Sequence, residues 1–146
     1  MDNKVSPLLA PVVALVIWTL IIQIWMYATR LPAMKRKGIS LKGRVGGKPG
    51  ILDGVVEDHV QWKAHNYNHL LEQPTLFYAV AISMVLLHGH GDSVTNIVLA
   101  WAYVVFRIAH SLVQVTVNVI LYRFVLFNLA SIVLLGLAIH AAIHAF

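Results

Sequence analysis

Three long segments without a charged residue dominate the hydrophobic pattern of the chain. They cover residues 5–29, 73–91 and 124–146, which is 25, 19 and 23 residues. A helix needs about 20 apolar residues to cross the hydrocarbon core of a bilayer. The pattern predicts helices over about 8–34, 59–87, 93–116 and 120–146, with the last boundary placed by length and polarity near residues 116–118. We therefore expect an all-α integral membrane protein, a four-helix transmembrane bundle in which residues 1–146 form a single domain.

The composition supports this class. Apolar residues make up 59% of the chain and charged residues only 12%, against about 25% charged in a typical soluble domain. The absence of cysteine excludes a disulfide scaffold, a thiolate metal site and a cysteine nucleophile. The first apolar segment is too long for the core of a signal peptide, so we expect it to be a retained span.

The net charge of +5 lies entirely between residues 30 and 63, which hold eight of the 11 Lys and Arg residues. The loop at 35–58 is therefore expected to be cytoplasmic, with both termini on the opposite side of the membrane. Anionic lipid headgroups of the bilayer, and not nucleic acid, are its expected partner. Six of the nine glycines also lie there, which indicates a mobile connector.

A column of polar side chains is expected inside the membrane. A charge at mid-membrane costs about 2.5–3.5 kcal/mol on insertion scales, so each one needs an explanation. At a rise of about 1.5 Å per residue, Glu72 and Arg107 reach similar depths on neighbouring helices, which predicts an ion pair. Three- and four-residue spacing places other polar residues on the same two helix faces. These are His65, Asn68 and His69 beside Glu72, and His110, Ser111, Gln114 and Asn118 beside Arg107.

Two interpretations of this column stay open. Interhelical polar contacts, worth about 1–2 kcal/mol or less each, can simply hold a bundle together. The position of Arg30, Lys63 and Arg123 at the mouth of the column favours a cavity for a small, soluble, anionic ligand.

Pro74 and two histidine pairs complete the candidate features. Pro74 removes a helical hydrogen bond, so it either kinks the helix to shape the site or is a tolerated membrane proline. The pairs His88 with His90 and His140 with His144 have spacings that metals use. Neither pair brings a third ligand such as a carboxylate, and no metal site is predicted.

Residues 63–78, KAHNYNHLLEQPTLFY, resemble the R-A-x-x-N-x-x-E-x-x-P-x-F region of the MAPEG superfamily, the membrane-associated proteins in eicosanoid and glutathione metabolism. The segment RIAH at 107–110 resembles the R-x-x-H segment of that family. Arg123 stands where the family carries an arginine at the start of its fourth helix. The chain resembles a divergent bacterial-type member, which implies a location in the bacterial inner membrane.

The resemblance implies a homotrimer that binds glutathione as co-substrate between subunits near the cytoplasmic face. Glutathione would add to a lipophilic electrophile or reduce a hydroperoxide. Arg123 would be the catalytic residue, because a guanidinium stabilises a thiolate without giving up its own proton. The other positions expected to bind glutathione are Arg30, Lys63, Asn68, Glu72, His110 and Gln114.

Departures from the family pattern keep a second hypothesis open. Lys63 replaces an arginine and cannot form the same two-pronged contact with a carboxylate. Asn68 and Glu72 are four residues apart instead of three. Gln114 stands where active relatives have tyrosine, and Phe124 where the prostaglandin E synthase branch has serine. The alternative is therefore a non-catalytic scaffold or accessory subunit of a larger membrane assembly. A channel or proton carrier is less favoured, since the fourth helix offers few polar residues for a path.

Overall fold

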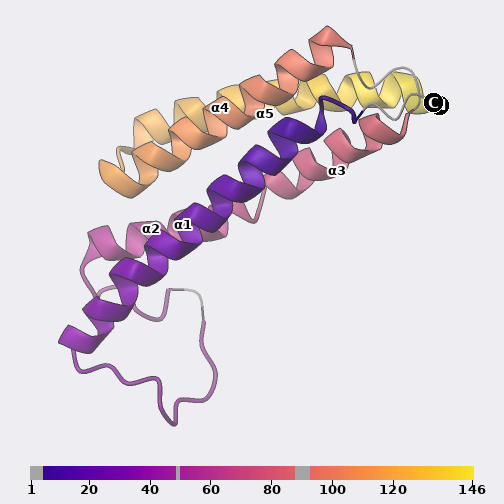
Figure 1. Ribbon diagram of the computed structural model, residues 1–146. Helices are drawn as coiled ribbons and strands as arrows, with labels where there is room; N and C mark the ends of the chain where they lie inside the picture. The colour runs from indigo at the N-terminus through magenta and orange to yellow at the C-terminus, as the bar shows by residue number, and fades with distance from the viewer. Residues whose placement is uncertain (1–4, 49, 88–92) are drawn as a thin grey trace.

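The computed structural model describes residues 5–48, 50–87 and 93–146, and the regular structure within them is entirely α-helical. The helices are α1 (Leu9–Arg36), α2 (Asp58–Leu70), α3 (Pro74–Leu86), α4 (Val94–Thr116) and α5 (Ile120–Ala145) (Figure 1). Helices α2 and α3 follow one another as one interrupted span, which gives four segments long and apolar enough to cross a membrane. At about 1.5 Å per residue, each exceeds the roughly 30 Å hydrocarbon core.

The span predicted over about 59–87 corresponds to Asp58–Leu86, but its helix is interrupted for three residues before Pro74. Helix α2 ends at Leu70 and α3 begins at Pro74. Proline has no backbone N–H and suits the first position of a helix, so it starts a new helix here. The turn is held by the Leu71 N–H donating to the Asn68 carbonyl at 2.9 Å and the Thr75 hydroxyl donating to the Glu72 carbonyl at 2.7 Å. The turn expected at 88–92, with His88 and His90, lies outside the described residues.

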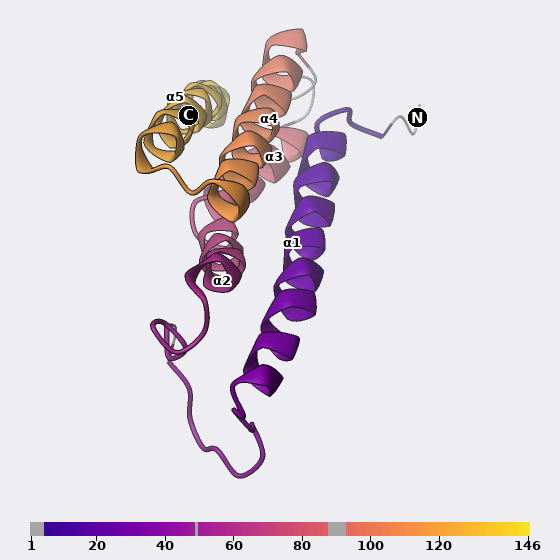
Figure 2. The same ribbon diagram turned by 90° about the vertical axis from the view of Figure 1, so that its left-hand side faces the viewer.

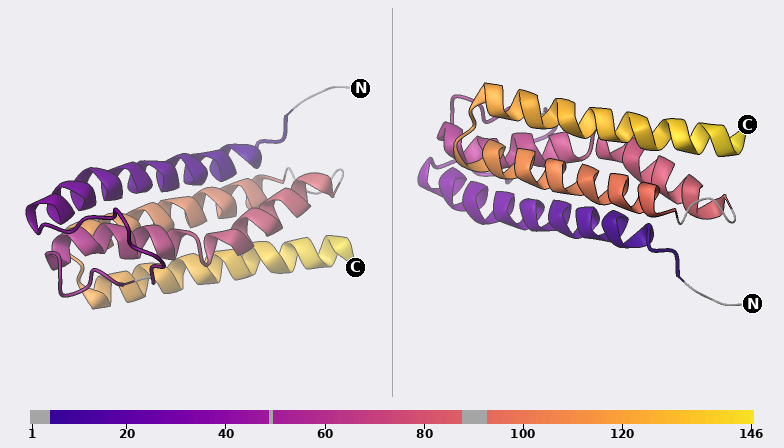
Figure 3. Two further views of the ribbon diagram at one scale, coloured as in Figure 1. Left: turned by 90° about the horizontal axis from the view of Figure 1, so that it is seen from below. Right: turned by 90° about the horizontal axis from the view of Figure 1, so that it is seen from above.

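The helices pack as a bundle in which α2 and α4 are central. Helix α1 contacts α2, α3 and α4, while α5 packs along α4 and also contacts α3. Helices α1 and α5 therefore lie on opposite sides of the bundle (Figure 2). The start of α1 and the end of α5 lie at one end, and the loop between α1 and α2 lies at the other (Figure 3).

The core is apolar, and much of the outer surface is too. Phe77 and Tyr103 stack with ring centroids 4.5 Å apart, and both side chains are fully buried. On α5, by contrast, Phe124, Ile132 and Ile143 are each about two-thirds exposed in the single chain. An apolar outer surface of this kind suits contact with lipid or with another membrane helix.

The basic loop is anchored to the bundle through its second half, which corrects the expectation of a mobile connector throughout. Leu52 and Val56 are buried against the end of α1 and the start of α2. Asp53 Oδ1 accepts a hydrogen bond from Gln61 Nε2 at 2.8 Å, and His65 Nε2 lies 3.1 Å from the same oxygen. The Gln61 hydrogen bond, opposed by desolvation and assisted by His65 and Arg30, holds the pKa of Asp53 below its usual value.

Candidate functional site

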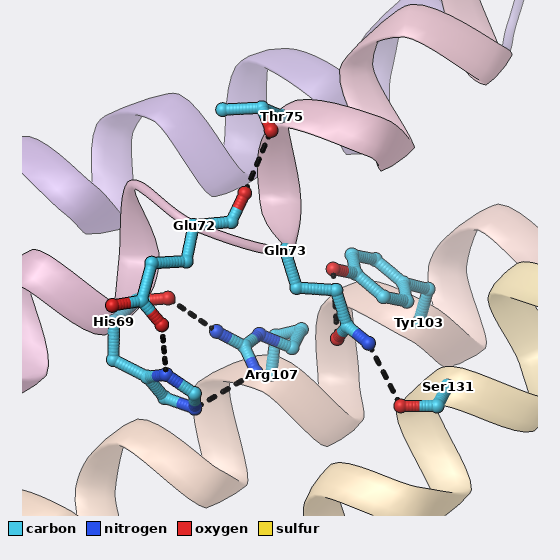
Figure 4. A network of polar contacts seen from close by, with 7 residues as sticks. All are labelled: His69, Glu72, Gln73, Thr75, Tyr103, Arg107 and Ser131. Carbon is cyan, nitrogen blue, oxygen red and sulfur yellow. Dashed lines mark hydrogen bonds and ion pairs between the residues drawn. The ribbon is translucent and has the colours of Figure 1, made fainter.

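Arg107 joins the middle of α4 to the break between α2 and α3 (Figure 4). Its exposed fraction is 0%, and its Nη2 donates to the His69 carbonyl at 2.9 Å. The last carbonyls of any helix lack intrahelical donors. The guanidinium therefore satisfies a backbone acceptor at the end of α2, which explains how a charge is held deep in the bundle.

His69 lies between Glu72 and Arg107 (Figure 4). Its Nδ1 is 3.0 Å from Glu72 Oε2, and its Nε2 is 3.5 Å from Arg107 Nη1. The ion pairs formed by the described residues do not include one between Glu72 and Arg107, so the predicted direct pair is replaced by an indirect contact. The physical reason is the break: Glu72 lies in the turn after α2, and its side chain is 68% exposed.

A second branch of the network ties the break to α5. Gln73 Nε2 donates to Ser131 Oγ at 2.7 Å, and the Tyr103 hydroxyl lies 3.5 Å from Gln73 Oε1 (Figure 4). Two neighbouring residues of the turn thus point in different directions, Glu72 outward and Gln73 into the bundle.

A pocket of about 420 Å³ opens where the ends of α2 and α4 meet the start of α5. It is lined by His69, His110, Ile120, Arg123, Phe124 and Phe127. The ring centroids of His69 and His110 are 4.9 Å apart, and the Arg107 guanidinium carbon lies 5.8 Å from the Phe127 ring centroid. The pocket therefore combines two imidazoles and a guanidinium with aromatic walls.

A buried hydrogen-bond donor at this pocket lacks an acceptor. Arg123 Nη1 donates to Asn118 Oδ1 at 2.8 Å, but Arg123 Nε is buried without a partner. Arg107 Nε is buried and unpaired as well, but Arg107 lies behind the pocket and does not line it. Buried polar groups in proteins are almost always paired, so an unpaired buried donor indicates a missing acceptor. A ligand in the pocket that carries negative charge would satisfy the Arg123 donor.

Two of the predicted glutathione-site residues, His110 and Arg123, line this pocket. Glu72 does not line it, but its carboxylate contacts His69, which does. Lys63 instead faces α1: its Nζ donates to the His59 carbonyl and lies 5.7 Å from the Trp25 ring centroid. Arg30 lines a different pocket, beneath the basic loop.

The remaining two predicted residues differ in exposure. Gln114 is 3% exposed, and its Oε1 has no hydrogen-bond partner. Asn68 is exposed on α2, one residue before His69. Neither lines the pocket around Arg123.

Part of the polar column holds the helices together, as the first interpretation proposed. Ser111 accepts hydrogen bonds from Trp18 Nε1, at 3.0 Å, and from Asn66 Nδ2. These contacts join α1, α2 and α4; the one from Asn66 is buried and the one from Trp18 is partly buried. The column is therefore divided between bundle contacts around Ser111 and a pocket around Arg123.

The roles of His69 and Phe127 do not follow from the sequence pattern. Helical spacing places His69 only on a polar helix face, whereas in the structure it is the contact between Glu72 and Arg107. Phe127 follows Arg123 by four residues, which places it on the same face of α5. That spacing was the available signal for an aromatic wall beside the arginine.

Together, the fold and the site define a polytopic helical membrane protein with a cationic pocket at a broken helix. The model of the MAPEG family matches residues 8–143, so the chain belongs to the MAPEG family. No curated protein and no solved structure matches the chain.

Proposed function

We propose that the protein is a glutathione-dependent transferase or peroxidase that acts on a lipophilic electrophile or hydroperoxide. The observation that carries the proposal is the unpaired, buried guanidinium Nε of Arg123 at a pocket that two imidazoles and two phenylalanine rings also line. Membership of the MAPEG family supports the choice of glutathione among anionic ligands.

The residues at the pocket suit the groups that glutathione carries, which are two carboxylates, an ammonium and a thiol. Charge-assisted hydrogen bonds from guanidinium groups are well matched to carboxylate or thiolate. The carboxylate of Glu72, which is 68% exposed, can receive an ammonium. The aromatic rings of Phe124 and Phe127 offer contact area for a lipophilic co-substrate.

Arg123 has the central chemical role in this proposal. The glutathione sulfur adds to an electrophilic carbon–carbon double bond, and the thiol proton ends on the neighbouring carbon. In the peroxidase reaction two glutathione molecules reduce a hydroperoxide to alcohol and water and become a disulfide. Arg123 favours the ionised thiol by its charge and does not lose its own proton at neutral pH. His69, which hydrogen-bonds to Glu72, holds that carboxylate at the edge of the pocket.

We further propose that the site is completed by a neighbouring copy in a homotrimer. Glu72 lies midway along the span Asp58–Leu86, where an exposed carboxylate facing lipid would be costly. Lys63, which the resemblance assigns to glutathione, lies away from Arg123 within one chain. Contact with a neighbour would cover Glu72 and supply a further cation. The positive-inside rule and the resemblance support a bacterial inner membrane with the loop on the cytoplasmic side.

One observation favours the alternative of a non-catalytic scaffold or accessory subunit. Phe124 lines the pocket beside Arg123, and Gln114 is buried away from it, so no described hydroxyl group lines this pocket. A scaffold would use the polar network for stability alone. The two functions differ in whether glutathione binds and whether Arg123 affects turnover.

Calorimetric titration of the detergent-purified protein with glutathione tests the proposed function. We expect binding with a micromolar to low millimolar dissociation constant. Glu72→Gln should weaken it about three- to tenfold, because an exposed ion pair with an ammonium contributes about 1 kcal/mol. Asp58→Asn is the matched control, since it neutralises an exposed carboxylate at the start of α2, far from the break. Absence of binding at cytoplasmic glutathione concentrations would exclude a glutathione-dependent enzyme. If Asp58→Asn weakened glutathione binding as much as Glu72→Gln, Glu72 would not be part of the binding site.

A further inference from the structure

A second pocket, of about 370 Å³, lies between the end of α1 and the basic loop. Arg30 contributes a guanidinium from α1, and Arg44 contributes another from the loop. The rest of its wall is mostly apolar, with Tyr27, Leu31 and Met34 on the α1 side. It shares no lining residue with the pocket around Arg123, so the two pockets are separate features of the chain.

Packing fixes part of the wall of this pocket, and Arg30 and Arg44 both line it. Leu52 lines the pocket and is buried in the small cluster that fixes the loop to α1 and α2. Asp53 follows it and is held by Gln61 at 2.8 Å. One nearby carboxylate leaves the two guanidinium groups with a surplus of positive charge, within a segment whose net charge is +5.

The pocket lies at the membrane surface and is continuous with an apolar face of α1. The helix has 28 residues and a length of about 42 Å, which exceeds the roughly 30 Å core and takes its last turns to the headgroup layer. Leu20, Ile24, Tyr27 and Leu31 follow at three- and four-residue intervals, and each is about half exposed or more. Such spacing forms one stripe along the helix. The stripe leads from the bilayer interior to Arg30.

We infer that this pocket binds an anionic phospholipid of the surrounding bilayer. Its phosphodiester contacts Arg30 and Arg44, and one acyl chain follows the exposed stripe of α1. Arginine suits this role because its planar group can donate two parallel hydrogen bonds to a phosphate. The apolar wall and the stripe explain why the ligand is a lipid and not a free phosphate. The lipid fastens the loop to the bilayer independently of the glutathione proposal.

Native mass spectrometry of the purified full chain with phosphatidylglycerol and phosphatidylcholine of identical acyl chains tests this inference. We expect phosphatidylglycerol to bind more tightly, and Arg44→Gln to lower its affinity about five- to tenfold. Lys42→Gln removes one charge from the same loop but lines neither this pocket nor the one around Arg123. That control should change the affinity by less than about twofold. Glutathione binding should be unchanged in Arg44→Gln, which separates this site from the other.

Four results would overturn the inference. Equal affinity for the two lipids would show that the headgroup charge is not recognised. An unchanged affinity for phosphatidylglycerol in Arg44→Gln would show that Arg44 does not contact the lipid. Equal losses in Arg44→Gln and Lys42→Gln would indicate diffuse attraction to the loop. Competition by soluble glycerophosphoglycerol at the same concentration as the lipid would identify a soluble-anion site instead.

Discussion

Arg123→Ala is expected to lower glutathione turnover at pH 7 by about 10- to 30-fold, because the thiol loses the cation that favours its ionised form. A nearby opposite charge lowers the pKa of an acid by about 1–3 units. A thiol with an unperturbed pKa of about 8.5 is only a few per cent ionised at neutral pH. The measurement is the rate of conjugation of a lipophilic electrophile, followed across pH.

The pH profile separates this role from a structural one. The rate of Arg123→Ala should rise with pH and approach that of the unchanged protein above about pH 9.5, where the thiol ionises unaided. Arg123→Lys should retain part of the activity, because it keeps the charge. Tyr122→Phe is the matched control, since Tyr122 is 58% exposed and lines no described pocket with Arg123. A uniform loss at every pH would show that Arg123 does not act on the thiol.

Arg107→Ala is expected to destabilise the bundle by about 2–4 kcal/mol. The side chain is fully buried, so truncation leaves a cavity, and large-to-small core changes cost about 2–5 kcal/mol. The His69 carbonyl also loses its donor, which costs about 1–3 kcal/mol. Relief from burying a guanidinium offsets part of the sum. The free energy of unfolding in mixed micelles, followed by circular dichroism, measures the effect.

Two further variants show which contribution dominates. Arg107→Met fills most of the volume without a charge, so it should cost only about 1–2 kcal/mol, the loss of the carbonyl contact. Arg36→Ala is the control: that side chain is 62% exposed and lies 4.0 Å from Glu57, so the change should stay within about 0.5 kcal/mol. Equal stability of Arg107→Ala and the unchanged protein would contradict the structural role assigned to the guanidinium.

The spans were predictable from the sequence because length and the absence of charge decide them. Residues 124–146, for example, have no other stable arrangement in a membrane than a crossing helix. Pro74 also predicted a disturbance of the helix, but packing decides whether the helix is kinked or interrupted there. Whether a proline kinks a helix or interrupts it is decided by which neighbouring groups satisfy the freed carbonyls, and here Arg107 does so for His69.

The site was only partly predictable from the sequence. Helical spacing predicts the directions of side chains only within one continuous helix, and the helix is interrupted between α2 and α3. His110 and Arg123 were predictable because α4 and α5 are unbroken around them. Glu72 lies beyond the end of α2. The direction of its side chain therefore could not be predicted from the helix face that holds Asn68. The orientation of Lys63 toward Trp25 depends on how α1 packs on α2, which spacing within α2 does not specify.

The role of Arg123 is tested most directly by the ultraviolet absorbance of the thiolate when glutathione is added to the purified protein at pH 7. We expect a thiolate signal that is absent with S-methylglutathione and is lost in Arg123→Ala, while Tyr122→Phe retains it. Glutathione that binds by calorimetry but gives no thiolate signal would contradict the role of Arg123. No binding at all would leave the polar network as a structural feature of a non-catalytic MAPEG protein.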